Sequence, residues 1–149
     1  LFYCPPTSKV SYEALMKAVG QSEHWTLTDE GDRKKIEWAP AKAGYWFWAE
    51  VAQNCPCLGT SWNKLVQEQK LNLLSLEEYV IVWWAHKVVS STMLDIKTWS
   101  WLRTRFGSSA LYADEYFGRV NVRRWLAVAL ADSYGGEGGR AAEVVQDAT

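Results

Sequence analysis

Apolar residues recur with the period of an α-helix in parts of this chain. Near the N-terminus, four apolar residues fall at the positions i, i+3, i+4 and i+7 that share one helix face; they are Tyr12, Leu15, Met16 and Val19. We therefore predict a short helix over residues 11–19, after an extended N-terminus over residues 1–8. Residues 21–40 are polar and are predicted to be irregular.

The clearest helix start in the sequence is at Ser75. Ser75 and Glu78 match a capping box, in which each side chain accepts a hydrogen bond from the other residue's backbone N–H group. The run from Tyr79 to Ala85 is apolar nearly all round and also has high β-propensity, so a strand is the alternative there. The cap and the absence of turn residues within the run favour a helix. We expect helical structure to continue to about Gly107, either unbroken or restarted.

Shorter helices are predicted in four further segments. Residues that favour helix ends bound them; the segments are residues 40–54, 62–74, 110–117 and 122–134. The predicted fold is therefore mostly α, with five or six helices in a single domain over residues 1–134. Four of the five residues from Gly135 to Gly139 are glycine, so residues 135–149 are predicted to be a glycine-rich linker and a short acidic tail.

Tryptophan is unusually frequent, with ten in 149 residues. Four consecutive aromatic residues, Tyr45 to Trp48, would cover about 300° of a helix surface, and Trp99 and Trp101 would point to nearly opposite faces. A chain of this length has few places to bury both sides of a helix. We therefore predict that some of these rings contact another molecule, although a single crowded aromatic core is the alternative.

Protein–protein contact is the favoured role for these residues, because Trp, Tyr and Arg dominate the binding energy of interfaces. We predict a structural, non-catalytic subunit or adaptor of a larger protein assembly, such as an accessory subunit of an organellar or membrane-associated complex. Its partners would be other protein subunits, in a homo- or hetero-oligomer. The predicted interface residues are Trp46, Trp48, Trp83, Trp84, Trp99, Trp101, Arg103, Arg105, Tyr116, Arg119, Arg123 and Trp125.

The charge distribution suggests a second hypothesis. The net charge of −1 argues against a protein that coats nucleic acid, but residues 83–126 carry seven basic and three acidic side chains, a net charge of +4. Residues 113–126 have the pattern of a short helix, a glycine turn and a second helix with arginines near its start. A helix-turn-helix-like nucleic-acid-binding module is therefore an alternative, although nucleic acid is not the favoured partner.

Several segments also resemble, in their order, the core proteins of hepadnavirus-like capsids. They are Trp48-Ala49-Glu50-Val51, the long predicted helix from Ser75 to Gly107, and Tyr116-Phe117-Gly118. The resemblance covers about half of the chain and implies a self-assembling helical viral capsid protein. The chain departs from that family because it lacks a proline-rich stretch and an arginine-rich tail after the last helix. In addition, Pro56 and Gly59 would interrupt the first hairpin helix.

Catalytic and cofactor-binding motifs are absent from the sequence. No nucleophile elbow, Walker, Rossmann or zinc-protease pattern occurs, so we predict no enzymatic activity, no cofactor and no metal site. His24 and His86 are best explained as structural histidines. No apolar run approaches the roughly 18–20 residues that span a bilayer, so we predict no transmembrane segment. Peripheral membrane contact through a belt of Trp and Tyr side chains is an alternative.

Three cysteines suggest the compartment. Cys55 and Cys57 are too close for an unstrained disulfide, and with Cys4 the count is odd. Reduced thiols are therefore expected, which fits an intracellular, reducing compartment. The chain begins at Leu1 instead of methionine, so removal of a targeting segment from an organellar protein is one explanation.

Overall fold

The computed structural model describes residues 1–6, 12–18, 35–37, 43–125 and 135–145. These residues form eight strands, two α-helices and one short π-helix, so the prediction of a mostly α, five- or six-helix domain is wrong. In chain order the elements are β1 (Phe2–Cys4), α1 (Tyr12–Ala18), β2 (Ile36–Glu37), β3 (Tyr45–Ala49), η1 (Lys64–Glu68), α3 (Leu76–Ser90), β4 (Trp99–Phe106), β5 (Ser109–Tyr116), β6 (Arg119–Trp125), β7 (Glu137–Gly139) and β8 (Ala142–Val144).

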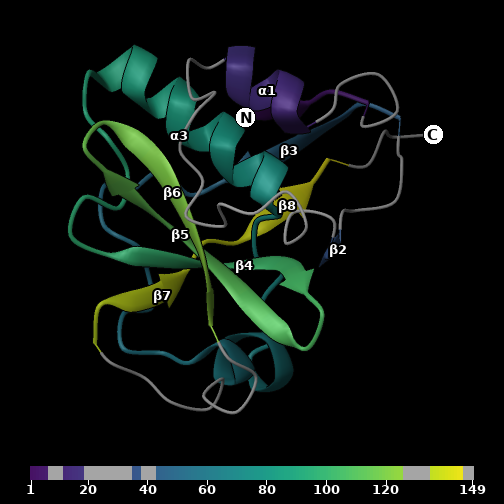
Figure 1. The fold of residues 1–149 in the computed structure, drawn as a ribbon, viewed down its shortest axis with the longest axis vertical. Helices are drawn as coiled ribbons and strands as arrows, with labels where there is room; N and C mark the ends of the chain where they lie inside the picture. Colours follow the sequence, from purple (N-terminus) through teal and green to yellow (C-terminus); the bar gives the residue numbers. More distant parts are fainter. Residues whose placement is uncertain (7–11, 19–34, 38–42, 126–134, 146–149) are drawn as a thin grey trace.

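The strands form two sheets (Figure 1). The smaller sheet is antiparallel and has the order β1-β3-β8. The larger sheet has the antiparallel order β2-β4-β5-β6, and β7 pairs in parallel with β4. Strand β5 pairs along one side of β4. On the other side of β4, β7 pairs with its first residues and β2 with its last residues.

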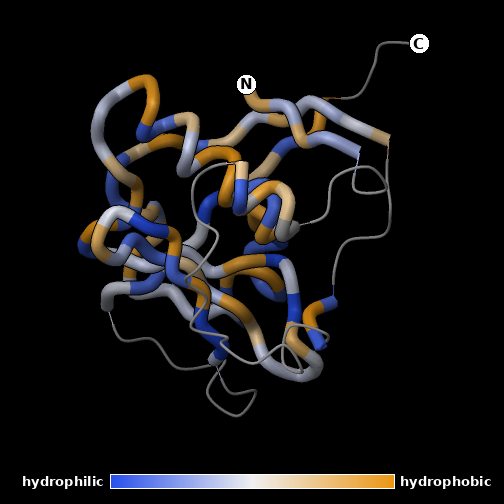
Figure 2. The backbone as a smooth tube through the Cα atoms, turned by 45° about the horizontal axis from the view of Figure 1, so that its top comes forward, coloured by the Kyte–Doolittle hydropathy of each residue, from blue (hydrophilic) through white to orange (hydrophobic). Residues whose placement is uncertain are grey.

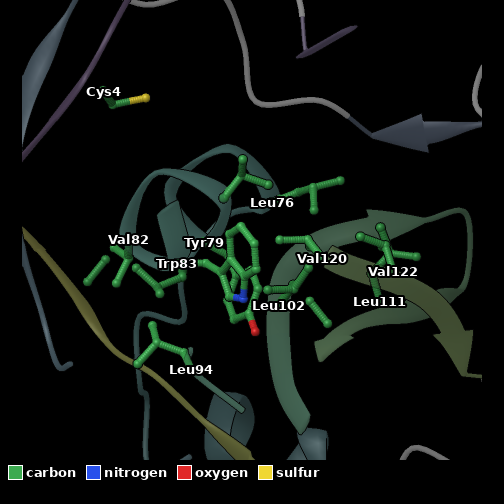
Figure 3. Close-up of a cluster of buried hydrophobic side chains, with 14 of the residues drawn as sticks. Cys4, Leu76, Tyr79, Val82, Trp83, Leu94, Leu102, Leu111, Val120 and Val122 are labelled. Atoms are coloured by element: carbon green, nitrogen blue, oxygen red, sulfur yellow. The ribbon is translucent and has the colours of Figure 1, made fainter. Parts of the chain in front are cut away.

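Helix α3 packs between the two sheets and is the centre of the main core. It contacts β1 of the smaller sheet and β4 of the larger one. Figure 3 shows the buried rings of Tyr79 and Trp83 among side chains such as Leu102 and Val120 of the larger sheet. A helix that packs against buried side chains on more than one of its faces needs apolar residues nearly all round. This packing explains why the residues from Tyr79 to Ala85 are nearly all apolar.

The start of α3 is confirmed, but its predicted length is wrong. Both hydrogen bonds of the capping box between Ser75 and Glu78 are present. The helix ends at Ser90, since Ser91 adopts the left-handed conformation with φ of 57°. Residues 99–106, which were expected to continue it, form β4. The predicted helix at 11–19 is confirmed as α1 (Tyr12–Ala18).

Other predicted helices are strands. Residues 45–49 form β3 within the predicted helix 40–54, and residues 109–116 form β5 in place of the helix 110–117. The described part of the helix 122–134 belongs to β6, and residues 126–134 lie outside the described residues. Within residues 62–74, helical structure is limited to a few residues around η1. Figure 2 shows hydrophobic and hydrophilic stretches that follow one another at short intervals along the backbone.

The described part of the predicted linker and tail, residues 135–145, forms strands β7 and β8. A Cβ atom at position 138 would lie 2.2 Å from the carbonyl oxygen of Pro56 and 3.0 Å from Cys55 Sγ. The neighbouring Gly139 donates its backbone N–H to the same Pro56 oxygen at 3.1 Å. Glycine at 138 therefore allows the chain to lie directly against the loop that contains Cys55.

We predict that Gly138→Ala destabilises the fold by about 3 kcal/mol, because the new methyl group meets a backbone oxygen that cannot move away easily. Gly107→Ala is the matched control. Position 107 has a φ of +55° but no atom within 4 Å of a new Cβ, so only conformational strain of about 1 kcal/mol is expected. Urea unfolding of both variants measures the difference, and equal losses would contradict the close approach.

Candidate functional site

A fully buried ion pair joins Asp95 and Arg140. Both side chains are fully buried, and Arg140 Nη2 lies 2.7 Å from Asp95 Oδ1. The carboxylate accepts five hydrogen bonds in all, two of them from Arg140 and one each from hydroxyl groups of Tyr79, Thr98 and Ser100. A carboxylate with so many donors is satisfied within the fold.

The surroundings of this ion pair indicate a structural role. Arg140 also donates to the backbone carbonyls of Glu50 and Gln53, and the Asp95 N–H donates to the Gln53 carbonyl at 2.8 Å. Tyr79, which donates to Asp95, has its pKa raised well above the usual value, chiefly by burial. The network therefore joins α3, β4, the loop after β3 and the C-terminal segment, and each of its groups already has a protein partner.

A second polar cluster surrounds the start of α3. The buried Glu78 carboxylate accepts from Tyr45 Oη at 2.6 Å, from the Ser75 N–H at 2.7 Å and from Arg103 Nη2 at 3.1 Å. Arg103 also donates to the side chain of Asn72. Burial, followed by the neighbouring Glu78 carboxylate, raises the pKa of Tyr45. The predicted interface residue Arg103 is therefore half-buried and serves as the partner of a buried carboxylate.

Glu77 differs from Glu78 because, among the described residues, its buried carboxyl group forms no ion pair. Its side chain is buried, and among the described residues its Oε2 atom has no hydrogen-bond partner. Desolvation by burial raises the pKa of this carboxyl, against smaller lowering contributions from its backbone N–H and from Ser75.

The cysteines are free in the structure, with Cys4 and Cys55 buried and Cys57 exposed. Burial raises the pKa of Cys4 to about 11 and that of Cys55 to about 12. Since the thiolate is the reactive form, neither buried thiol is activated. His86 hydrogen-bonds to Ser90 and Thr92 within its own helix end, and His24 lies outside the described residues. Within the described ranges no group of three metal-binding side chains occurs.

Several predicted interface tryptophans instead form an inner aromatic cluster on the larger sheet. Trp99 and Trp101 point to the same face, because residues two apart on a strand share a face. Their rings lie 5.0–6.0 Å from those of Tyr112 and Trp125. Trp62 belongs to the same cluster and has the Arg105 guanidinium 4.5 Å above its ring. These aromatic residues therefore contribute to a core, although Trp99 and Trp125 are only partly buried.

A different pair of tryptophans lies on the outer face of the smaller sheet. Trp46 and Trp48 of β3 are 50% and 55% exposed, whereas Phe47 between them is fully buried against the core. The alternation follows from strand geometry, since successive side chains point to opposite faces. The helix expected here was wrong, yet both indoles are at the surface.

Neighbouring strands extend this exposed group. Tyr3 of β1 pairs with Trp46, and their ring centroids are 5.2 Å apart. On the other side Val145 donates its N–H to the Trp46 carbonyl at 3.0 Å, and Glu143 pairs with Trp48. We call this surface the aromatic face; its residues, each of them exposed, are Leu1, Tyr3, Trp46, Trp48, Glu143 and Val145.

An open hollow of about 550 Å³ adjoins the aromatic face. It is lined by Trp48 of β3 and by Glu143, Val144 and Val145 at the end of β8. The hollow therefore combines an indole, two aliphatic side chains and one carboxylate. Sequence reasoning found Trp48 but missed Tyr3 and Val145, because only strand pairing places these distant residues together.

The remaining predicted interface residues are dispersed. Trp83 is buried in the main core, while Trp84 on the same helix is 43% exposed. Tyr116, Arg119 and Arg123 are exposed on the β5–β6 hairpin. In the described residues this hairpin stands where the helix-turn-helix was predicted. Of the long helix in the capsid resemblance, only Leu76–Ser90 is helical, as α3, and residues 99–106 form β4.

Comparisons with known proteins add no assignment. No family model, curated protein or solved structure matches this chain at a significant level. None of the helices in the described part of the chain is long and apolar enough to cross a membrane.

We predict that Glu77→Gln stabilises the protein at pH 7. Because the folded-state pKa lies above the unfolded value of 4.5, folding opposes ionisation of Glu77, and stability falls as the pH rises above that value. The amide removes this cost. The thermal midpoint should therefore rise at pH 7 and stay unchanged at about pH 3, where both states hold the proton. Glu143→Gln, at an exposed site, should have no such effect; a lower midpoint for Glu77→Gln at pH 7 would contradict the assignment.

The thiols should differ in reactivity towards an aromatic disulfide reagent at pH 8. We expect Cys57 to react rapidly in the native protein, and Cys4 and Cys55 to react only after unfolding, because they are buried and protonated. Cys57→Ser should remove the rapid phase. Equal rates for all three thiols in the native protein would contradict the structure.

Proposed function

We propose that this chain is a non-catalytic binding subunit that joins a larger protein assembly through the aromatic face. The observation that carries the proposal is the row of half-exposed rings, Tyr3, Trp46 and Trp48, on one side of a small sheet. Aromatic side chains bury a large area with few rotatable bonds, so they contribute strongly to protein interfaces. The fold does not need these rings for its core, because Phe47 fills the inner side of the same strand.

The chemistry of the aromatic face supports a protein partner with a particular composition. Residues 1–6, 43–50 and 142–145, which contain the three strands, include Glu50 and Glu143 but no basic side chain. Both carboxylates are exposed. Complementary charge improves specificity and the rate of association, so the expected partner presents an apolar surface bordered by lysine or arginine.

The hollow beside Trp48 supports the same proposal. Interface hot spots cluster in pockets that exclude water when the partner's side chain enters. This open hollow, lined by Trp48, Glu143, Val144 and Val145, would accept one lysine or arginine of the partner, with its apolar stem against the indole and its charge close to Glu143.

Photo-crosslinking tests the proposal. With benzoylphenylalanine in place of Trp46, irradiation in an extract of the source cells should give one discrete crosslinked product. The same group in place of Trp84, an exposed tryptophan outside the aromatic face, should not give that product. Excess wild-type protein should compete, whereas the double variant Trp46→Ser, Trp48→Ser should not.

The double variant must also remain folded for the comparison to be valid. Since both rings are half-exposed, we expect its unfolding free energy to stay within about 1 kcal/mol of wild type. Absence of a product from position 46, or an identical product from position 84, would refute the proposed role of the aromatic face.

A further inference from the structure

The tip of the β5–β6 hairpin carries an exposed aromatic pair in a strained turn. Tyr116 pairs with Arg119, so Phe117 and Gly118 are the two central residues of the turn. Tyr116 is 56% exposed and Phe117 is 84% exposed, with their rings in edge-to-face contact at 4.5 Å. Both central residues have positive φ, +51° at Phe117 and +78° at Gly118.

Phenylalanine is a poor residue for this conformation. A two-residue turn with positive φ at both positions strongly prefers Asn-Gly, Asp-Gly or Gly-Gly, since other side chains crowd the backbone there. The β4–β5 hairpin of the same sheet follows the preference, with glycine at its one positive-φ turn position, Gly107. Phe117 is so exposed that core packing does not explain its presence. Strain at an exposed position is the kind of observation that suggests a function.

The end of α3 lies beside this tip (Figure 1). Lys87, in the last turn of α3, donates from Nζ to the Gly118 carbonyl at 3.3 Å. The two residues that follow, Val88 and Val89, are 61% and 86% exposed. We call Val88, Val89, Tyr116 and Phe117 the hairpin-tip surface. It is apolar, comes from two adjacent elements and lies apart from the strands of the aromatic face.

The exposed charge at the tip is positive, since Arg119 follows the turn directly. Arg123 and Arg124 are also exposed but lie further along β6, where the Arg124 guanidinium stacks over the Phe106 ring. The nearest acidic residue, Glu115, is half-buried, and its carboxylate accepts the Gly118 N–H within the turn. Apolar side chains at a projecting turn, next to basic side chains, match the requirements of an anionic bilayer surface. A protein hot spot would more often lie at the centre of a broad interface.

We propose that the hairpin-tip surface inserts Phe117 and Tyr116 into the headgroup region of an anionic lipid bilayer. Val88 and Val89 of α3 add apolar area beside the tip, while Arg119 pairs with lipid phosphate. Tyr116 suits this depth because its ring is apolar and its hydroxyl group is polar, whereas Phe117 contributes apolar area alone. Phe117, at the apex of the strained turn, enters the bilayer first.

Vesicle co-sedimentation of the full chain tests this proposal. Wild type should bind phosphatidylcholine vesicles that contain phosphatidylserine, bind pure phosphatidylcholine vesicles more weakly, and lose affinity as salt is added. Phe117→Asn should weaken binding at least about tenfold, since it removes the buried aromatic area. Arg119→Gln should weaken it about fivefold on the anionic vesicles.

Phe117→Asn also separates binding from folding. Asparagine suits the left-handed conformation, so the variant should have a higher thermal midpoint than wild type while binding worse. Trp48→Ser, on the aromatic face, should bind vesicles like wild type, which keeps this test independent of the proposed protein interface. No binding by wild type, or unchanged binding by Phe117→Asn, would overturn the proposal. A lower thermal midpoint for Phe117→Asn, or a protein crosslinked through position 117, would also overturn it.

Discussion

The buried ion pair of Asp95 and Arg140 is the interaction on which the arrangement of this protein depends. It joins residues 45 positions apart in the chain, and Arg140 lies between strands β7 and β8, which pair with β4 and β3. Removal of one partner from a buried pair leaves an uncompensated charge, which costs about 3–5 kcal/mol. The hydroxyl groups of Tyr79, Thr98 and Ser100 complete the shell of the carboxylate, so the position of α3, of β4 and of the C-terminal strands is set together.

The two proposed contact surfaces lie on different parts of this framework. Helix α3 is packed between the sheets, so the inner side of β3 contributes to the core while its outer side presents Trp46 and Trp48. The hairpin-tip surface instead lies where the end of α3 meets the turn of β5–β6. A subunit with one acidic aromatic surface and one basic apolar tip could bind a protein and a bilayer at the same time.

The errors in the predicted fold have a common cause. A helix and a strand both explain short apolar runs, and in β3 and β5 the large aromatic residues fill positions that fit either period. Gly107 and Gly118 each follow a predicted helix, a position that glycine favours, but each lies in a two-residue hairpin turn, where glycine is equally favoured. The prediction that Trp46 and Trp48 lie at the surface assumed a helix, which is wrong. Both are exposed because they alternate with the buried Phe47 on strand β3.

The sequence by itself determined the features that depend on neighbouring residues. The capping box of Ser75 and Glu78 starts α3, and the short helix α1 follows its local apolar period, because hydrogen bonds between residues three or four apart are encoded locally. Tertiary structure alone decided that Tyr3, Trp46 and Val145 share one surface and that Arg140 reaches Asp95. These contacts join distant segments, and strand pairing gains its energy only from partners that a local pattern does not specify.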